Sequence, residues 1–288
     1  MSSPLHRTVR SVPALHRILQ SAKTRLHRAT LHSLEKRVSR AEHYEIFVIF
    51  GMRRSGNHVT INWLLNQNPG TVVFYNNIRP ENPPYSARMT EYRLRLTDRK
   101  PRIVLSYEDV SIAEMQWAHL TDFLTDRQAR HGASVRFGVM MRDPYNLFAS
   151  RLRKWPERFS TPGDRAAQRT LYLEHARLAL NPTPIWQDAP VVPLLYNNLI
   201  SDRAARDNLA DQLEISRGTK GLDDIPVYGH GSSFDGTEVS GAVVRDQVFS
   251  RWQTLTGNPL FEDMVRHSEI MEIGTRLFNM PAPFSPTD

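Results

Sequence analysis

Residues 46–65, IFVIFGMRRSGNHVTINWLL, constrain the fold of this chain more than any other segment. They open with five consecutive apolar residues, all β-branched or aromatic, which is the composition of a buried parallel strand. A loop bounded by Gly51 and Gly56 follows, and His58–Gln67 then has the apolar spacing of a helix. A buried strand that enters a helix through such a loop predicts the first unit of a parallel α/β sheet.

Strand-like and helix-like segments alternate along the rest of the chain. The further strands are expected at Val72–Tyr75, Arg102–Ser106, Val135–Met141 and Val191–Leu195, the last weakened by Pro193. The further helices are expected at Ile112–Arg130, Pro144–Arg153, Arg165–Leu180, Ser201–Leu213 and over most of 246–279. Residues 76–100 are expected to form a loop with some helix. The alternation predicts one α/β domain over 44–288, with a central parallel sheet flanked by helices.

The positive charge of the chain is concentrated before this domain. Residues 1–40 hold nine Lys or Arg and one acid, Glu35, while the other 248 residues carry a net charge of −1. Apolar residues recur at roughly helical spacing within 1–43. Two interpretations stay open for this segment: a basic amphipathic helix on an anionic membrane or a partner, or a solvated tail. The nearly neutral domain is not expected to bind nucleic acid.

The absence of cysteine excludes disulfides, thiolate metal sites and cysteine nucleophiles. It is consistent with a reducing compartment. No apolar run approaches the ~20 residues that a membrane-spanning helix requires, and no stretch has the form of a signal peptide. The expected location is therefore cytoplasmic, with peripheral membrane contact of residues 1–43 as the alternative.

The loop between the first strand and the first helix has the features of an anion-binding site. Backbone N–H groups at a helix N-terminus converge on one point, and the helix dipole favours negative charge there. Arg53 and Arg54 add donor forks that suit phosphate or sulfate oxygens. Further donors come from the polar residues Ser55, Asn57, His58 and Thr60. The segment therefore predicts a cradle for a phosphate or sulfate group.

The cradle has the spacing of a Walker A loop without its key residues. Asn57 and His58 stand where that loop needs a lysine and a Mg²⁺-binding hydroxyl. A kinase or nucleotide-binding protein that uses ATP with Mg²⁺ is therefore a disfavoured alternative.

The tripeptide Arg54-Ser55-Gly56 after a strand resembles the 5′-phosphosulfate loop of the sulfotransferases that use 3′-phosphoadenosine 5′-phosphosulfate (PAPS). That family usually has Lys or Arg, then Ser-Gly-Thr-Thr, so Asn57 and His58 make this a variant loop. The resemblance implies the P-loop NTPase-like sulfotransferase fold, with PAPS as the co-substrate and no metal. It also implies that Arg54 neutralises charge on the leaving oxygen, with Arg53 as the second choice.

A second matching segment follows the expected strand at 135–141. Arg142-Asp143-Pro144, with Ser150 eight residues after the arginine and Arg151 next to it, resembles the family's second segment. The resemblance implies that Arg142 and Ser150 bind the 3′-phosphate of the donor. Proline presets the first turn of the expected helix, so Ser150 lies about two turns along it.

Three later segments resemble the family less specifically, and the resemblance as a whole covers about residues 45–260. Tyr196 opens a segment similar to the family's Tyr-Glu-Asp-Leu, with asparagines in place of the acids. Ser233 and Phe234 lie in a stretch similar to the one that lines the adenine pocket. Arg245, seven residues before Trp252, resembles an arginine that grips the 3′-phosphate. Core packing is the alternative for each of these residues.

The acceptor needs a general base, and the family's frequent histidine is missing after the third strand. Glu108 is the first candidate and Asp109 the second. The alternative is that this acidic pair caps the following helix. His58 is a further candidate, although its place in the cradle favours a bond to phosphate.

The acceptor is expected to be a small molecule or a glycan, such as a glycolipid, with a hydroxyl or an amine. It would be bound by residues 76–100 and 154–190, whose arginines and aromatic residues suit an anionic or sugar-bearing molecule. A third reading is a non-catalytic, basic-tailed module for an anionic membrane or nucleic acid, with a degenerate loop.

Overall fold

The computed structural model describes residues 44–87, 89–93, 101–115, 117–222, 248–281 and 283–285. All described residues belong to one unit of the chain, which begins after Glu42. The predictions for residues 1–43, and for Ser233, Phe234 and Arg245, therefore lie outside the described residues.

The described unit is an α/β domain built on a six-stranded sheet with the order β3-β2-β4-β1-β5-β6. Five strands are parallel, as predicted, and β3 pairs antiparallel with β2 at one edge. The expectation of a loop at 76–100 was therefore wrong for β3. The strands are β1 (Glu45–Gly51), β2 (Val72–Tyr75), β3 (Met89–Arg93), β4 (Arg102–Glu108), β5 (Ser134–Met141) and β6 (Val191–Leu195).

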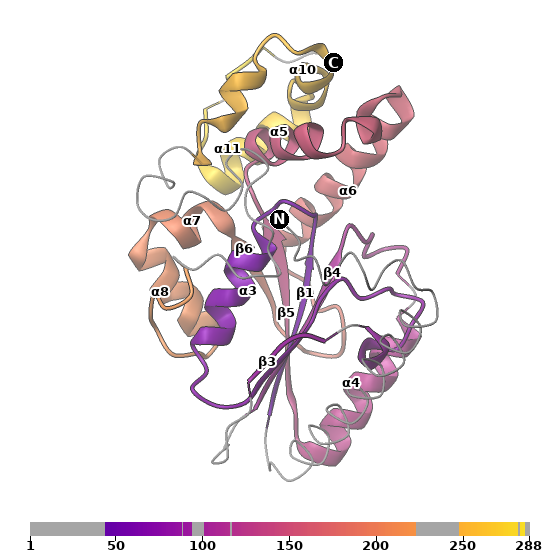
Figure 1. The fold of residues 1–288 in the computed structure, drawn as a ribbon, viewed down its shortest axis with the longest axis vertical. Coiled ribbons are helices and arrows are strands. Elements are labelled where there is room, and N and C mark those ends of the chain that lie inside the picture. Colours follow the sequence, from indigo (N-terminus) through magenta and orange to yellow (C-terminus); the bar gives the residue numbers. More distant parts are fainter. Residues whose placement is uncertain are drawn as a thin grey trace, which may run out of the picture. The chain divides into compact units, whose positions relative to one another are not determined.

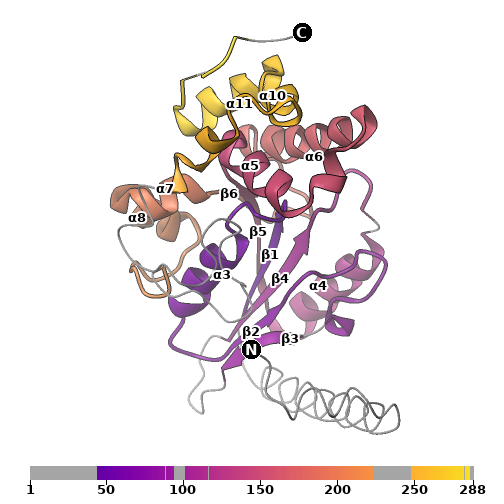
Figure 2. The same ribbon diagram turned by 45° about the horizontal axis from the view of Figure 1, so that its top comes forward.

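Helices cover both faces of the sheet. In Figures 1 and 2, α3 and α8 lie on one side of the strands and α4 lies on the other. The α-helices are α3 (Asn57–Asn66), α4 (Ala118–His131), α5 (Pro144–Lys154), α6 (Pro162–Leu180), α7 (Tyr196–Ser201), α8 (Arg203–Gln212), α10 (Pro259–Val265) and α11 (Ser268–Phe278). The short 3₁₀ helices are η1 (Pro84–Ser86), η2 (Pro156–Phe159) and η4 (Arg251–Leu255). Among the described residues, no helix combines the length and apolarity needed to span a membrane.

Capping explains where the helix boundaries differ from the sequence predictions. The helix expected from Arg165 begins at Pro162, because Thr161 and Asp164 form a reciprocal capping box. Asp202 accepts bonds from the N–H groups of two following residues, so it caps α8 and separates it from α7. The helix expected from Ile112 begins only at Ala118.

The core lies on both faces of β1, whose last six residues are all buried. On one face, Phe47 and Ile49 join Trp63 and Leu64 of α3 in a hydrophobic cluster. On the other, Phe50 stacks on Phe137 at a centroid distance of 6.2 Å. Burying each such side chain contributes about 1.5–3 kcal/mol, so β1 and α3 are fixed firmly relative to each other.

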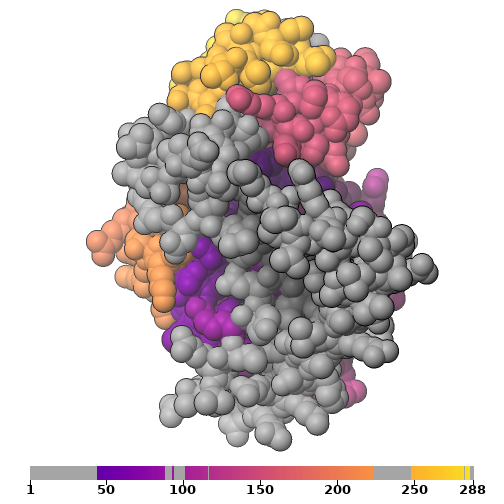
Figure 3. Space-filling model, viewed as in Figure 1, coloured from indigo at the N-terminus to yellow at the C-terminus, as the bar shows by residue number. Residues whose placement is uncertain are grey.

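A second group of helices packs at the end of the sheet where the parallel strands finish. Figure 2 shows α5, α6, α10 and α11 grouped there, and α5 contacts α10, α11 and η4. The rings of Tyr145 and Trp252 lie 5.7 Å apart at this contact, so Trp252 packs on α5. In the space-filling view, the yellow C-terminal helices adjoin the rose segment that contains α5 and α6 (Figure 3).

Candidate functional site at the carboxyl ends of β1, β4 and β5

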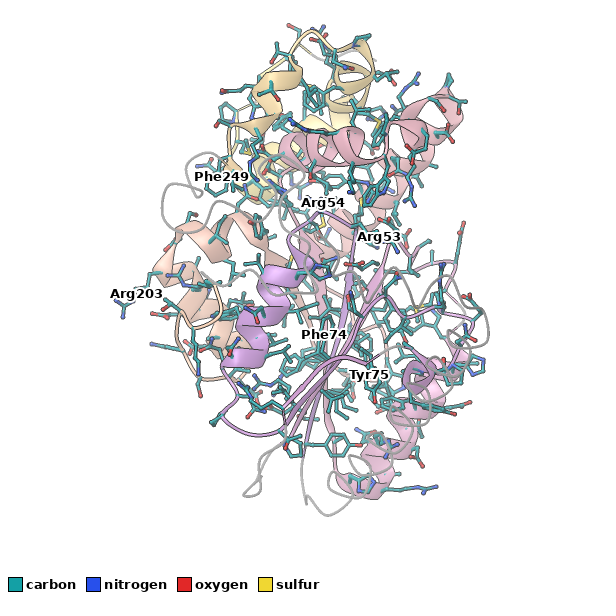
Figure 4. All side chains as sticks on the ribbon, viewed as in Figure 1. Arg53, Arg54, Phe74, Tyr75, Arg203 and Phe249 are labelled. Carbon is teal, nitrogen blue, oxygen red and sulfur yellow. The ribbon has the colours of Figure 1, made fainter. Side chains whose placement is uncertain are left out.

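The register of the central strands brings the predicted site residues to one edge. Gly51, the last residue of β1, is level with Glu108 of β4 and with Met140 of β5. The helices that follow β1 and β4 lie on opposite faces of the sheet (Figure 1). In open α/β sheets, ligands bind outside the carboxyl ends of two such strands. Figure 4 shows Arg53 and Arg54 at this edge, close beneath α5.

Two glycines allow the loop to turn tightly. A Cβ atom on Gly51 would lie 2.7 Å from Asn57 Oδ1 and 2.8 Å from Met140 Cβ. Gly56 has a φ of 97°, and a Cβ there would lie 2.1 Å from Cδ2 of Tyr196. Both positions therefore require glycine, and the Tyr196 ring packs directly on the start of α3.

The polar side chains of the loop hold its own turn. Ser55 Oγ lies 2.7 Å from the Met52 carbonyl oxygen and 2.9 Å from Asn57 Oδ1. Asn57 Nδ2 donates to the Met52 carbonyl and, at 2.9 Å, to Glu108 Oε1. These two buried side chains fix the shape of the cradle, and Asn57 ties Glu108 to it.

Asp109 is surrounded by donors from three segments. Its Oδ1 accepts from the Arg53 backbone N–H at 2.9 Å and from Arg151 Nη1 at 2.6 Å. Its Oδ2 accepts from Arg158 Nη1 at 3.1 Å. Burial alone would raise the pKa of Asp109, but Arg151 and Arg53 outweigh it and hold the pKa below its usual range. A carboxylate held in this way is a weak proton acceptor.

Glu108 accepts fewer hydrogen bonds than Asp109, although its side chain is also largely buried. Besides the bond from Asn57, its carboxylate lies 3.5 Å from Arg53 Nε and 3.8 Å from His58 Nε2. The same His58 nitrogen lies 3.2 Å from Asn76 Nδ2. The alternative that Glu108 and Asp109 cap the following helix is wrong, because α4 begins at Ala118 with Trp117 at its N-cap.

Arg54 connects the cradle to α5. Its Nε donates to Ser150 Oγ at 3.1 Å, and its φ of 76° is unusual for a side-chain-bearing residue. Burial, and then the charges of Arg142 and Arg251, lower the pKa of Arg54 below its usual value. The guanidinium stays charged at neutral pH. Three cations are therefore gathered here, which favours a multiply charged anion between them.

Arg142 lies beside the same loop, just past the end of β5. Its Nη1 donates to the Arg54 carbonyl oxygen at 3.2 Å and its Nη2 to that of Val248 at 3.3 Å. Its Nε is buried and has no hydrogen-bond partner among the residues that the structure describes. The guanidinium lies 5.3 Å from the centroid of the Tyr196 ring. The contacts place a buried guanidinium beside Arg54, within reach of a shared anion.

The side-chain amide of Asn197, which replaces an acid of the resembled family, is bonded to Asp143. Its Nδ2 donates to Asp143 Oδ2 at 3.0 Å, and its Oδ1 accepts from the Asp143 backbone N–H. Asp143 also caps α5 by accepting from the Asn146 N–H at 2.8 Å. An acid at 197 would set two buried carboxylates against each other, whereas the amide satisfies both groups.

The structure brings most of the predicted residues together. The predicted residues that meet at this edge are Arg53, Arg54, Ser55, Gly56, Asn57, His58, Glu108, Asp109, Arg142, Ser150 and Tyr196. Sequence reasoning missed Asn77, whose Oδ1 accepts from Arg53 Nη2 at 2.8 Å, and Gln168, which binds Arg151. Neither residue lies in a motif. Among the described residues, no group of three or more His, Asp or Glu side chains could hold a metal ion.

No protein-family model matches the chain, and no curated protein matches its sequence.

Proposed function

We propose that the chain is a PAPS-dependent sulfotransferase that moves the sulfuryl group to a hydroxyl or amine. The observation that carries this proposal is the meeting of two anion-binding elements at one sheet edge. One is the loop before α3 with Arg53 and Arg54, and the other is Arg142 with Ser150. Their contact is direct, since Arg54 Nε donates to Ser150 Oγ and Arg142 donates to the Arg54 carbonyl.

Two linked anion-binding elements suit a ligand with two anionic groups. In this proposal the loop amides and Arg54 hold the 5′-phosphosulfate, while Arg142 and Ser150 hold the 3′-phosphate. The Tyr196 ring, which lies against Gly56 and Arg142, would then contact the adenosine. Guanidinium groups bind phosphate and sulfate oxygens through paired donors, so this set can grip the donor without a metal.

The transfer step requires an in-line displacement. The acceptor oxygen or nitrogen forms a bond to sulfur as the bond from sulfur to the bridging oxygen breaks, which releases 3′-phosphoadenosine 5′-phosphate (PAP). Arg54 neutralises the charge that develops on that oxygen. Glu108 takes the acceptor proton, since its carboxylate is less engaged than that of Asp109.

Side chains at the same edge of the sheet support a proposal for the class of acceptor. Arg158 has a half-exposed side chain, contacts Asp109, and lies 5.1 Å from the centroid of the Trp155 ring. A cation on an aromatic ring is a surface that suits a polar or sugar-bearing acceptor. We therefore propose a hydroxyl-bearing small molecule or glycan.

The test is calorimetric titration of the wild type with PAP in the absence of Mg²⁺. We expect micromolar binding that weakens about a hundredfold or more in Arg142→Ala, since a buried charged donor to the phosphate is lost. The matched control is Arg203→Ala, whose side chain is 85% exposed on α8 and lies far from Arg53 and Arg54 in Figure 4. A folded wild type that does not bind PAP, or that binds only ATP with Mg²⁺, would contradict the proposal.

A further inference from the structure

One ion pair, Asp109 with Arg151, binds both the backbone N–H and the backbone carbonyl of Arg53. Its N–H donates to Asp109 Oδ1 at 2.9 Å, and its carbonyl oxygen accepts from Arg151 Nη1 at 2.9 Å. The same Nη1 donates to Asp109 Oδ1 at 2.6 Å. The pair therefore grips the two polar backbone groups of Arg53 and fixes the orientation of both flanking peptides.

The ion pair is itself anchored by other elements. Arg151 has a fully buried side chain on α5, and its Nε and Nη2 both donate to Gln168 Oε1 of α6, at 3.0 and 2.6 Å. The Asp109 backbone N–H donates to the Gly51 carbonyl at 3.0 Å. The end of β4, α5 and α6 thus meet at this pair, and its hydrogen bonds to Arg53 go to backbone groups.

The loop contains backbone strain that such anchoring can hold. Arg54, Asn77 and Asp109 are three of the six described non-glycine residues with positive φ, and all three lie at this edge. Asparagine and aspartate adopt that conformation readily, but arginine does not. Strained backbone persists only where its surroundings hold it in place. Here Arg142 holds the Arg54 carbonyl, and the Asp109–Arg151 pair holds the residue before it.

We propose that Asp109 and Arg151 are positioning residues that keep residues 52–57 in their anion-binding conformation before any ligand arrives. Asp109 then acts through Arg53 and accepts no proton from the acceptor. The statement about ligand affinity rests on the proposed function, whereas the statement about the loop does not. A loop ordered in advance loses less conformational freedom on binding, so the pair strengthens affinity without touching the ligand.

The first readout is amide hydrogen exchange of the full-length protein without ligand. One variant is Asp109→Asn, which keeps the preference for positive φ but removes the negative charge. The other is Arg151→Lys, which keeps the positive charge but loses the guanidinium that bonds Asp109, Arg53 and Gln168 at once. The control is Arg102→Lys, which weakens another buried ion pair at the opposite ends of β1 and β4. We expect exchange in peptides covering 52–57 to quicken about tenfold in Asp109→Asn and less in Arg151→Lys. Arg102→Lys should leave these peptides unchanged.

The second readout is calorimetric affinity for PAP. A positioning role predicts that Asp109→Asn weakens PAP binding about tenfold and that Arg151→Lys weakens it less. A role as the base predicts unchanged PAP affinity, and that result would overturn the proposal. So would unchanged exchange at 52–57 in a folded Asp109→Asn protein. If the wild type fails to bind PAP, the proposed function is wrong, but the exchange readout still decides the role of the pair.

Discussion

The two ends of β1 and β4 use the same chemical pair for different purposes. At the amino end, Arg102 donates to Glu45 Oε2 through Nε and Nη2, at 3.0 and 2.7 Å. These residues are also level in the strand register. At the carboxyl end, Arg151 contacts Asp109, but the pair joins a loop to two helices instead of one strand to the next.

The balance of charge separates the two ends more clearly than the pairs themselves. At the amino ends, Arg102 is matched by Glu45 and Arg136 by Glu214. At the carboxyl end, Asp109 alone accepts bonds from Arg53, Arg151 and Arg158. Arg54 and Arg142 add two further cations beside the loop. At the amino end these two arginines each have an acidic partner, and Arg93 beside them donates to the Leu65 and Asn68 carbonyls. At the carboxyl end several arginines gather around one loop in a partly buried setting, which favours binding an anion.

The largest expected effect tests whether the amino end is purely structural. Arg102→Met should lower the free energy of unfolding by about 3 kcal/mol, because it leaves Glu45 without its partner and the Leu64 carbonyl without its donor. Denaturant unfolding measures the loss, and calorimetry should find PAP affinity unchanged in the folded protein. Weakened PAP binding would show that the two ends are coupled.

The next effect tests the chemistry at the carboxyl end. Glu108→Gln keeps the oxygen that Asn57 binds but cannot take a proton, so PAP formation from PAPS with a hydroxyl acceptor should slow about a hundredfold or more. PAP affinity should not change. The control is Glu272→Gln, whose side chain is 59% exposed on α11. Full turnover by the Glu108→Gln protein would contradict the proposal that Glu108 is the base.

A smaller effect concerns pH. His175 is fully buried beneath the Asp109 segment, and its Nε2 donates to the Val110 carbonyl at 3.0 Å. Burial lowers the pKa of His175 below its usual value, so the unfolded chain binds this proton more readily than the folded one. The free energy of unfolding should therefore be highest above the unfolded pKa of ~6.5 and decrease as the pH falls below that value. The total decrease is about 1.4 kcal/mol for each unit by which folding lowers the pKa.

The matched variant for this pH effect is His175→Gln, which keeps a donor for Val110. Its free energy of unfolding should change less than that of the wild type between about pH 7 and pH 5. If the free energy of unfolding changes equally with pH in the two proteins, His175 does not cause the acid sensitivity.

The smallest expected effect separates strain from function at Arg54. Arg54→Gly relieves the positive φ but gives the unfolded chain more freedom, so the unfolding free energy should change by less than about 1 kcal/mol. PAP binding should weaken strongly, since the guanidinium beside Ser150 is lost. A large loss of stability instead would mean that the Arg54–Ser150 bond is structural.

The sequence predicted the strands well where composition decides. β2 and β6 have the predicted bounds, and β1, β4 and β5 differ by one or two residues at an end. The agreement reflects the mostly apolar composition of buried parallel strands. The antiparallel β3 was missed, since MTEYR is no more apolar than the segments around it. β3 forms by pairing with β2, and a local sequence pattern does not predict such a pairing.

The candidate site was predictable as a set of residues but not as an arrangement. The order of strands and helices placed the loop after β1 and the Arg142 segment at one edge. The roles of Asp109 and Arg151 depend on the register that sets Gly51 level with Glu108, and on the packing of α5 against α6. Side-chain contacts between residues about forty to sixty positions apart, such as Arg151 with Asp109, leave no trace in a single sequence.

Pro193 in β6 has a consequence for self-association. The Phe137 N–H donates to the Pro190 carbonyl, and because polar groups alternate sides along a strand, position 193 faces away from β5. Among the described strands β6 is at the edge of the sheet, and its outer side thus lacks one of the donors that a neighbouring chain would need to extend it. Intermolecular strand addition is disfavoured at this edge, which guards a parallel sheet against aggregation while it folds.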